Sequence, residues 1–297
     1  MTNYYKLVDA NKARSIVVIA CFIAFISLAT YLICYALGFD LSAVGIAFIL
    51  SGTLSFFSFY YSDKMILSLS GAVPANKRDH FDFFTVAENI ARPAGIPLPK
   101  LYVIEDSAMN AFATGRDPEH AVVCITTGLM HKLNRTELEG VVAHEMSHIR
   151  NFDTRLMSIV TILVGLVSLL SDILLRTRIR GKSNRNDNGF GALLFISGII
   201  MALLSPIIAQ LIQLAISRRR EYLADASAAS ITKYPEGLAS ALEKLSGDKQ
   251  PLESANKATS HLFIVNPLKN RKDSLSWFTG LFNTHPPIKE RIKALRS

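Results

Sequence analysis

Four long apolar runs constrain this chain more than any other feature of its sequence. Residues 13–37 and 41–62 form the first pair, which carries no charge after Arg14. Each run reaches the roughly 20 residues that a helix needs to cross the hydrocarbon core of a membrane. Lysines and arginines flank the pair on both sides, so the positive-inside rule places both flanks in the cytoplasm. We therefore expect a chain that is anchored in a lipid bilayer.

The second pair of apolar runs, residues 156–175 and 190–216, is interrupted by polar residues such as Asp172 and by Pro206. Length favours a second spanning hairpin, and helices packed at the membrane face are the alternative. The strongly basic connection between the two runs opposes placing it outside the cell. These runs predict the following division of the chain: a transmembrane hairpin at 1–62, a soluble domain at 63–155 and 217–297, and a second hydrophobic hairpin at 156–216 inserted in that domain.

The distribution of charge and the cysteine content argue against a nucleic-acid-binding protein and against a disulfide framework. The formal net charge is +8, but the basic residues are scattered or end the apolar runs, without interleaved aromatic residues, so we expect no nucleic-acid partner. Three cysteines give neither a disulfide framework nor a CxxC metal pair. The soluble domain is therefore expected in a reducing compartment.

The soluble domain combines helical and strand patterns. Strands are expected at 101–105 and 121–126, and helices at 79–92, at 135–150, at about 217–230, up to Gly247 and after Pro287. The first helix should end before Pro93. The helix at 135–150 should begin with a capping box of Thr136 and Glu139.

His144, Glu145 and His148 form an H-E-x-x-H motif within the helix expected at 135–150. Residues four apart share one face of a helix, so both imidazoles can reach a single Zn²⁺ ion, and Glu145 lies beside them as a general base for peptide hydrolysis. A surface helix with two paired histidines is the alternative. The predicted fold class is an α-helical integral membrane protein with a zincin-like α+β metalloprotease domain.

Two other functions would also use zinc. A membrane scaffold or sensor with a purely structural zinc is opposed by Glu145, because a structural site needs no base. A transporter of zinc would need ligands inside the apolar runs, and these contain no histidine. An endopeptidase acting on polypeptide substrates remains the favoured hypothesis.

A catalytic zinc needs a third protein ligand, and Glu221 is the best candidate. Asp225 lies four residues later on the same helical face and could orient a histidine, while Ala224 and Ala228 would allow close helix packing. The alternative is that Glu221 pairs with an arginine at the membrane surface. Arg218–Arg220 are expected to act as a positive-inside anchor, although one of them could contact the cleft.

The combination of motifs resembles the HtpX heat-shock membrane proteases, relatives of the CAAX prenyl proteases. The resemblance covers essentially the whole chain, and its motifs are Asn110–Gly115, His144–His148, Glu221–Asp225 and Thr284–Pro287, together with the two apolar hairpins. It implies that Glu221 is the third zinc ligand. It also implies a multi-pass protein of the bacterial cytoplasmic (inner) membrane, with the catalytic domain facing the cytoplasm, that degrades misfolded or damaged membrane proteins in the stress response. No oligomeric state is predicted.

One further motif is assigned to substrate binding. The segment Asn110, Ala111, Phe112, Ala113 and Thr114 could be a strand edge on which the substrate backbone pairs. A loop that ends in glycine, with Phe112 in the core, is equally consistent with the residues, and the resemblance favours the edge.

His285 is assigned a catalytic role. It precedes two prolines and could lie near the cleft to stabilise the oxyanion, with an N-terminal cap or a packing role as the alternative.

Overall fold

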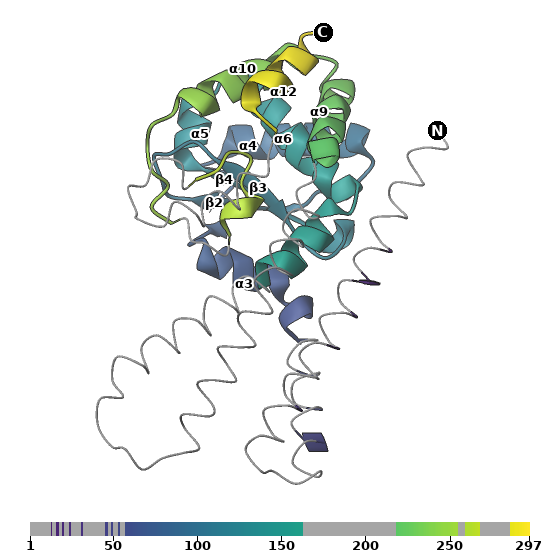
Figure 1. Cartoon of the computed structure of the whole chain (residues 1–297). Helices are drawn as coiled ribbons and strands as arrows, with labels where there is room; N and C mark the ends of the chain where they lie inside the picture. The colour runs from purple at the N-terminus through teal and green to yellow at the C-terminus, as the bar shows by residue number, and fades with distance from the viewer. Residues whose placement is uncertain are drawn as a thin grey trace, which may run out of the picture.

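The structure is a computed structural model, and it describes residues 57–162, 218–254, 259–267 and 286–297, with a few single residues between 13 and 53 (Figure 1). Most of the first predicted hairpin, residues 163–217 of the second, and His285 lie outside this described part. Among the described residues, no helix has both the length and the apolar composition to cross a membrane.

A four-stranded mixed sheet lies at the centre of the domain. Its strands are β1 (Val73–Pro74), β2 (Lys100–Ile104), β3 (Ala111–Thr114) and β4 (Val122–Thr126), in the spatial order β1-β2-β4-β3. Strands β2 and β4 are parallel, with Leu101 opposite Val123, whereas β1 and β3 are antiparallel edge strands. Every residue of β4 is buried, as expected for a β-branched strand covered on both faces.

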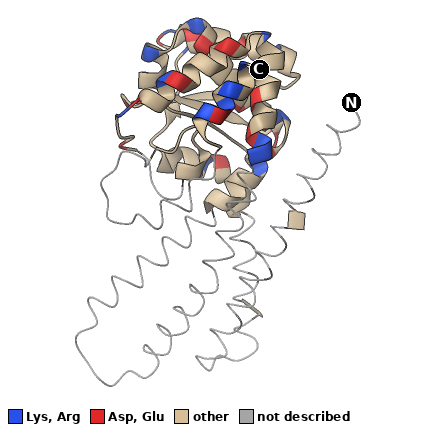
Figure 2. Cartoon of the chain, turned by 45° about the horizontal axis from the view of Figure 1, so that its top comes forward, with Lys and Arg blue, Asp and Glu red and all other residues tan. Residues whose placement is uncertain are grey.

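Helices pack around this sheet (Figure 1). They are α3 (Ser62–Leu69), α4 (Phe81–Ala94), α5 (Thr127–Lys132), α6 (Arg135–Arg150), α9 (Arg218–Thr232), α10 (Pro235–Gly247) and α12 (Ile288–Leu295). The hydrophobic core joins α4, the sheet, α6 and α10, with Phe83, Val123, Met146 and Leu242 at most 1% exposed. Acidic and basic residues are interspersed along the outer helices (Figure 2).

The predicted strands and helices are found to within about two residues of their expected ends, with two corrections. Helix α4 continues through Pro93 to Ala94, because Gly95 with φ of 70° supplies its C-cap instead. The capping box of α6 consists of Asn134 and Glu137 rather than Thr136 and Glu139. The Asn134 side chain accepts from the N–H of Glu137, whose carboxylate accepts from the N–H of Asn134.

A close approach of α10 fixes the position of α6. Gly140 lies where the two helices cross, and a Cβ atom on it would come within 2.6 Å of the backbone nitrogen of Leu238. Since a side chain at this position would push the helices apart, glycine is required for the observed packing. Helix α9 also packs against α6.

After α6, the chain continues as a helix over residues 153–162, which packs within the domain. Its residues from Leu156 to Ile162 are at most 9% exposed, although they begin the third apolar run. The Ser158 hydroxyl lies 3.0 Å from that of Thr114 in β3, and Thr161 Oγ1 lies 3.1 Å from His261 Nε2. The start of this apolar run therefore packs against the sheet.

Candidate metal centre and active site

Three side chains from α6 and α9 converge on one point. His144 Nε2 and His148 Nε2 lie 3.2 Å apart, and they lie 3.8 and 3.6 Å from the two carboxylate oxygens of Glu221. All three residues are at most 4% exposed, and their donor atoms lie within 4.8 Å of one another. Two imidazoles and one carboxylate are a donor set found in catalytic zinc sites, so these residues fit a metal ion.

Each histidine is held by a carboxylate at its other ring nitrogen. His144 Nδ1 lies 3.0 Å from Asp225 Oδ1, and His148 Nδ1 lies 3.1 Å from Asp153 Oδ2. When Nδ1 of each histidine carries the proton, it donates a hydrogen bond to the carboxylate. The unprotonated Nε2 then has a lone pair that can bind a metal ion at the shared centre. The structure thus brings Asp225 together with the possible metal ligands.

Asp153 was not anticipated from the sequence. It follows the end of α6, beyond Phe152, whose φ of 59° lies in the left-handed region that aromatic residues rarely adopt. This reversal turns the chain back, so that the Asp153 carboxylate contacts His148. In the sequence, the signal for this contact is an acidic residue five positions after His148.

Two buried arginines complete the charge cluster. Arg291 of α12 donates from Nη2 and Nε to the two carboxylate oxygens of Asp225, at 2.7 and 2.8 Å. Its Nη1 lies 3.4 Å from Glu221 Oε2. Arg220 Nε lies 3.7 Å from Asp153 Oδ1. Arg220 thus lies at the centre, whereas its neighbours in the Arg218–Arg220 run are exposed.

Glu145 lies beside these groups and is 2% exposed. Burial raises the pKa of Glu145 to about 7, although the neighbouring His148 ring and the Ala113 N–H act in the opposite direction. Burial lowers the pKa of His148, but the hydrogen bond to Asp153 and the charge of Glu221 outweigh it and raise the pKa to about 9. A carboxylate with a pKa near neutrality suits a general base.

The segment from Asn110 to Thr114 is an edge strand whose side chains are buried. Phe112 is fully buried and its ring contacts that of Phe263 at 5.1 Å between centroids. The Ala111 carbonyl accepts from the N–H of Ile264 at 3.0 Å, and β3 packs against α6, the helix that carries Glu145. Phe112 lies in the core, as the second alternative expected, but residues 111–114 form an edge strand instead of a loop. The pairing of a substrate with this edge stays a prediction.

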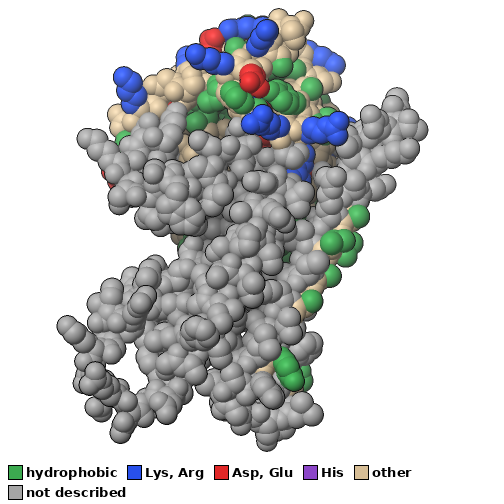
Figure 3. Space-filling model, in the orientation of Figure 1, with side chains coloured by type: hydrophobic (Ala, Val, Ile, Leu, Met, Phe, Trp, Pro, Cys, Tyr) green, Lys and Arg blue, Asp and Glu red, His purple; other side chains and the backbone are tan. Residues whose placement is uncertain are grey.

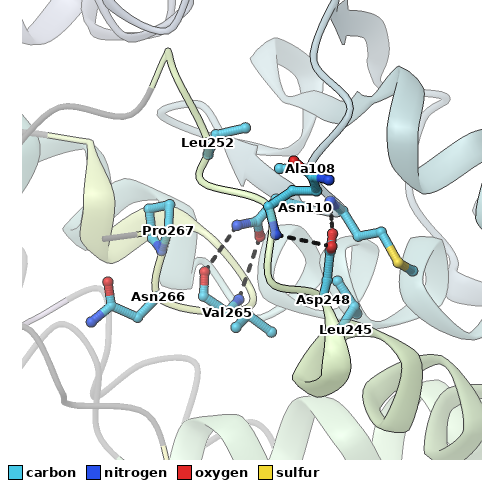
Figure 4. A pocket seen from close by; sticks show the side chains of 10 residues that line it. Ala108, Asn110, Leu245, Asp248, Leu252, Val265, Asn266 and Pro267 are labelled. Atoms are coloured by element: carbon cyan, nitrogen blue, oxygen red, sulfur yellow. Dashed lines mark hydrogen bonds between the residues drawn. The ribbon is translucent and has the colours of Figure 1, made fainter. Parts of the chain in front are cut away.

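The Asn110 side chain bonds to the backbone of Val265. Its amide donates to the Val265 carbonyl at 3.0 Å and its oxygen accepts from the Val265 N–H at 3.4 Å (Figure 4). Nearby, the Asp248 carboxylate accepts from the Met109 N–H at 2.7 Å. These bonds tie the start of β3 to the segments that follow α10.

Comparison with known proteins identifies the family. Residues 82–297 match Peptidase family M48. The chain belongs to peptidase family M48. It is 43% identical over 299 residues to the protease HtpX homolog of Dictyoglomus thermophilum, with 99% of this chain and 94% of that protein covered. It is 42% identical over 298 residues to the protease HtpX homolog of Thermoanaerobacter pseudethanolicus, with 99% and 97% covered.

The fold of this M48 protein is shared with a solved structure. The crystal structure of S. mikatae Ste24p matches with a TM-score of 0.50 and 18% identity, over 100% of this chain and 67% of that chain. The expected resemblance to HtpX proteases is confirmed, as is the metalloprotease domain of the expected fold class. The chain is therefore a metalloprotease of the HtpX type, with His144, His148 and Glu221 clustered as possible metal ligands.

Proposed function

We propose that this chain is a zinc endopeptidase, anchored in the bacterial inner membrane, that cuts misfolded or damaged membrane proteins at the cytoplasmic face. The observation that carries the proposal is the convergence of His144, His148 and Glu221 beside the buried carboxylate of Glu145. A structural site would have no use for that additional carboxylate.

The mechanism follows from the positions of these side chains. His144, His148 and Glu221 would hold the zinc ion, which when bound supplies a Lewis acid that polarises the scissile carbonyl and acidifies water. Glu145 takes a proton from the attacking water on its carboxylate and passes it to the nitrogen of the leaving amine. Asp153 and Asp225 keep the histidine rings oriented throughout.

Substrate binding is assigned to the edge of the sheet. The backbone of an extended substrate would pair with β3, and recognition through main-chain groups would give low sequence selectivity. The packing of β3 against α6 supports this assignment, because it brings the edge strand next to the helix that carries Glu145. The motif around His285 also suggests that this residue stabilises the oxyanion, and that role remains a prediction.

Membrane anchoring is proposed from the apolar runs at 1–62 and 156–216, which flank and interrupt a catalytic domain at 63–155 and 217–297. The described side chains of the first two runs support it, because Ile16, Val17 and Ile49 are 62%, 60% and 68% exposed. Figure 3 shows hydrophobic side chains at the surface away from the charged face of the domain. Apolar side chains exposed on helical backbone suit contact with lipid.

The metal centre would lie close to the bilayer. His148 precedes the third apolar run by eight residues, and Glu221 follows the fourth by five. The helix from His148 does not continue, because the chain reverses at Phe152 and residues 156–162 pack within the domain, so the distance to the bilayer is taken from α9. At 1.5 Å per residue, a helix continuous with the fourth run would place Glu221 within roughly 15 Å of the membrane surface. This position suits loops and tails of membrane proteins as substrates, and the similarity to HtpX proteases supports a role in protein quality control under stress.

The test is cleavage of unfolded casein and of a membrane protein by the full chain, purified in detergent and loaded with zinc. Glu145→Gln at matched zinc content is the comparison, and we expect at least a 100-fold loss of cleavage because the general base is removed. If the native chain and the variant bind zinc equally and neither cuts, the site is structural and the proposal fails.

A further inference from the structure

The C-terminal helix α12 inserts one charged side chain into the metal centre. Arg291 is 0% exposed, whereas Lys289 and Lys293 on the same helix are exposed. Its guanidinium bonds to both oxygens of Asp225 and reaches Glu221 at 3.4 Å, and its Nη2 lies 3.4 Å from His144 Nδ1. The Arg291 side chain therefore contacts Glu221, Asp225 and His144.

The carboxylates of the centre need such a partner. Glu221 and Asp225 lie one turn apart on α9 and are both buried, so they repel each other when both are ionised. The planar guanidinium offers fixed donors that can bridge two carboxylates, which the single ammonium of lysine cannot do in the same geometry. Arg291 thus bridges the two carboxylates and fixes the direction in which Glu221 presents its oxygens.

The rest of α12 is docked by contacts that do not involve the metal centre. Arg296 forms ion pairs with Glu236 and Glu243 of α10, and the Tyr222 hydroxyl donates to Glu290 at 3.1 Å. Leu295 is 9% exposed and belongs to the core. Loss of a docking contact can therefore be separated from loss of the contact in the centre.

We propose that Arg291 is a positioning residue of the metal centre, which holds Glu221 and Asp225 in the geometry that binds zinc, so that the C-terminal helix completes the site. The proposal rests on the zinc site of the proposed function. It extends that function because it makes zinc affinity depend on a side chain from the last turns of the chain.

The test compares the zinc dissociation constants of full-length native chain, Arg291→Lys and Arg291→Gln, measured in detergent by competition with a chelator. Both variants should bind zinc roughly 10 to 100 times more weakly, the range found when partners of metal ligands are removed. Arg296→Gln is the matched control, since it loosens α12 without touching the centre, and its zinc affinity should stay within about twofold of native.

Thermal unfolding of the metal-free proteins separates positioning from folding. A purely structural arginine would lower the unfolding temperature but leave the zinc affinity of the folded variants unchanged, and this result would overturn the proposal. An equal fall in affinity for Arg296→Gln would also overturn it, because docking of the helix would then explain the effect. If one variant at Arg291 does not fold, the other gives the same comparison. A native chain that binds no zinc would refute the proposed function itself.

Discussion

At the scale of single residues, buried carboxylates differ in their partners and therefore in their pKa values. Glu145 has its pKa raised to about 7, mainly by burial. Burial also raises the pKa of Glu137, but hydrogen bonds from Lys244, Ser240 and Asn134 outweigh it and leave the pKa below its usual value. The first arrangement suits proton transfer, whereas the second stabilises the start of α6.

Glu137 should make stability depend on pH. Because its pKa is lowered in the folded state, its contribution is fully present above the pKa of the unfolded chain and is lost as the pH falls through the folded-state value. Glu137→Gln should lower the free energy of unfolding by about 1–3 kcal/mol at pH 7, and the difference from native should shrink below about pH 4. Thermal unfolding at several pH values measures this, with the more exposed Glu139→Gln as control. A difference that stays constant down to pH 3 would contradict the assignment.

At the scale of secondary-structure elements, the site depends on how closely three helices approach. Ala224 and Ala228 of α9 are fully buried, and α9 brings Glu221 to the histidines of α6. On its other side α6 crosses α10 at Gly140, where the neighbouring backbone leaves no room for a Cβ atom. The helix that carries both histidines is therefore fixed from two directions.

Replacement of Gly140 tests this packing. Alanine favours a helix by up to about 1 kcal/mol over glycine, but its Cβ would lie 2.6 and 2.8 Å from backbone atoms of Leu238. We expect the overlap to dominate and Gly140→Ala to destabilise the domain by about 1–3 kcal/mol. Gly247→Ala is the control, since no atom lies within 4 Å of its added Cβ. Equal unfolding temperatures for the two variants would show that the crossing is not tight.

The helices around the motif could be predicted from sequence because their signals are local. H-E-x-x-H spacing places His144 and His148 on one face whatever surrounds the helix. Asp153 and Arg291 could not be predicted, because their roles depend on a backbone reversal and on contacts between distant helices. A buried arginine in a basic terminal helix has the same sequence pattern as one exposed to solvent.

At the scale of the whole molecule, one helix connects the candidate metal centre to the proposed membrane anchor. The helix that begins at Asp153 carries a partner of His148 at one end and enters the third apolar run, where Ser158 contacts β3. The two predicted hairpins lie mostly outside the described residues, so the anchor itself remains a prediction.

Anchoring is tested by washing membranes from expressing cells with alkaline carbonate. The full chain should remain in the membrane pellet, because runs of about 20 apolar residues are stable in the hydrocarbon core. A peripheral membrane protein in the same sample should be released and serves as control. Recovery of the chain in the supernatant would contradict the spanning hairpins while leaving the proposed chemistry intact.

The central claim is that His144, His148 and Glu221 hold one catalytic zinc while Glu145 acts without binding it. The most direct measurement is the zinc content per folded chain, determined together with casein cleavage for the native protein, Glu145→Gln and Glu221→Ala. We predict one zinc per chain for the native protein and for Glu145→Gln, loss of most of the zinc for Glu221→Ala, and cleavage by the native protein alone. Full zinc content in Glu221→Ala, or equal loss of zinc in both variants, would contradict these roles.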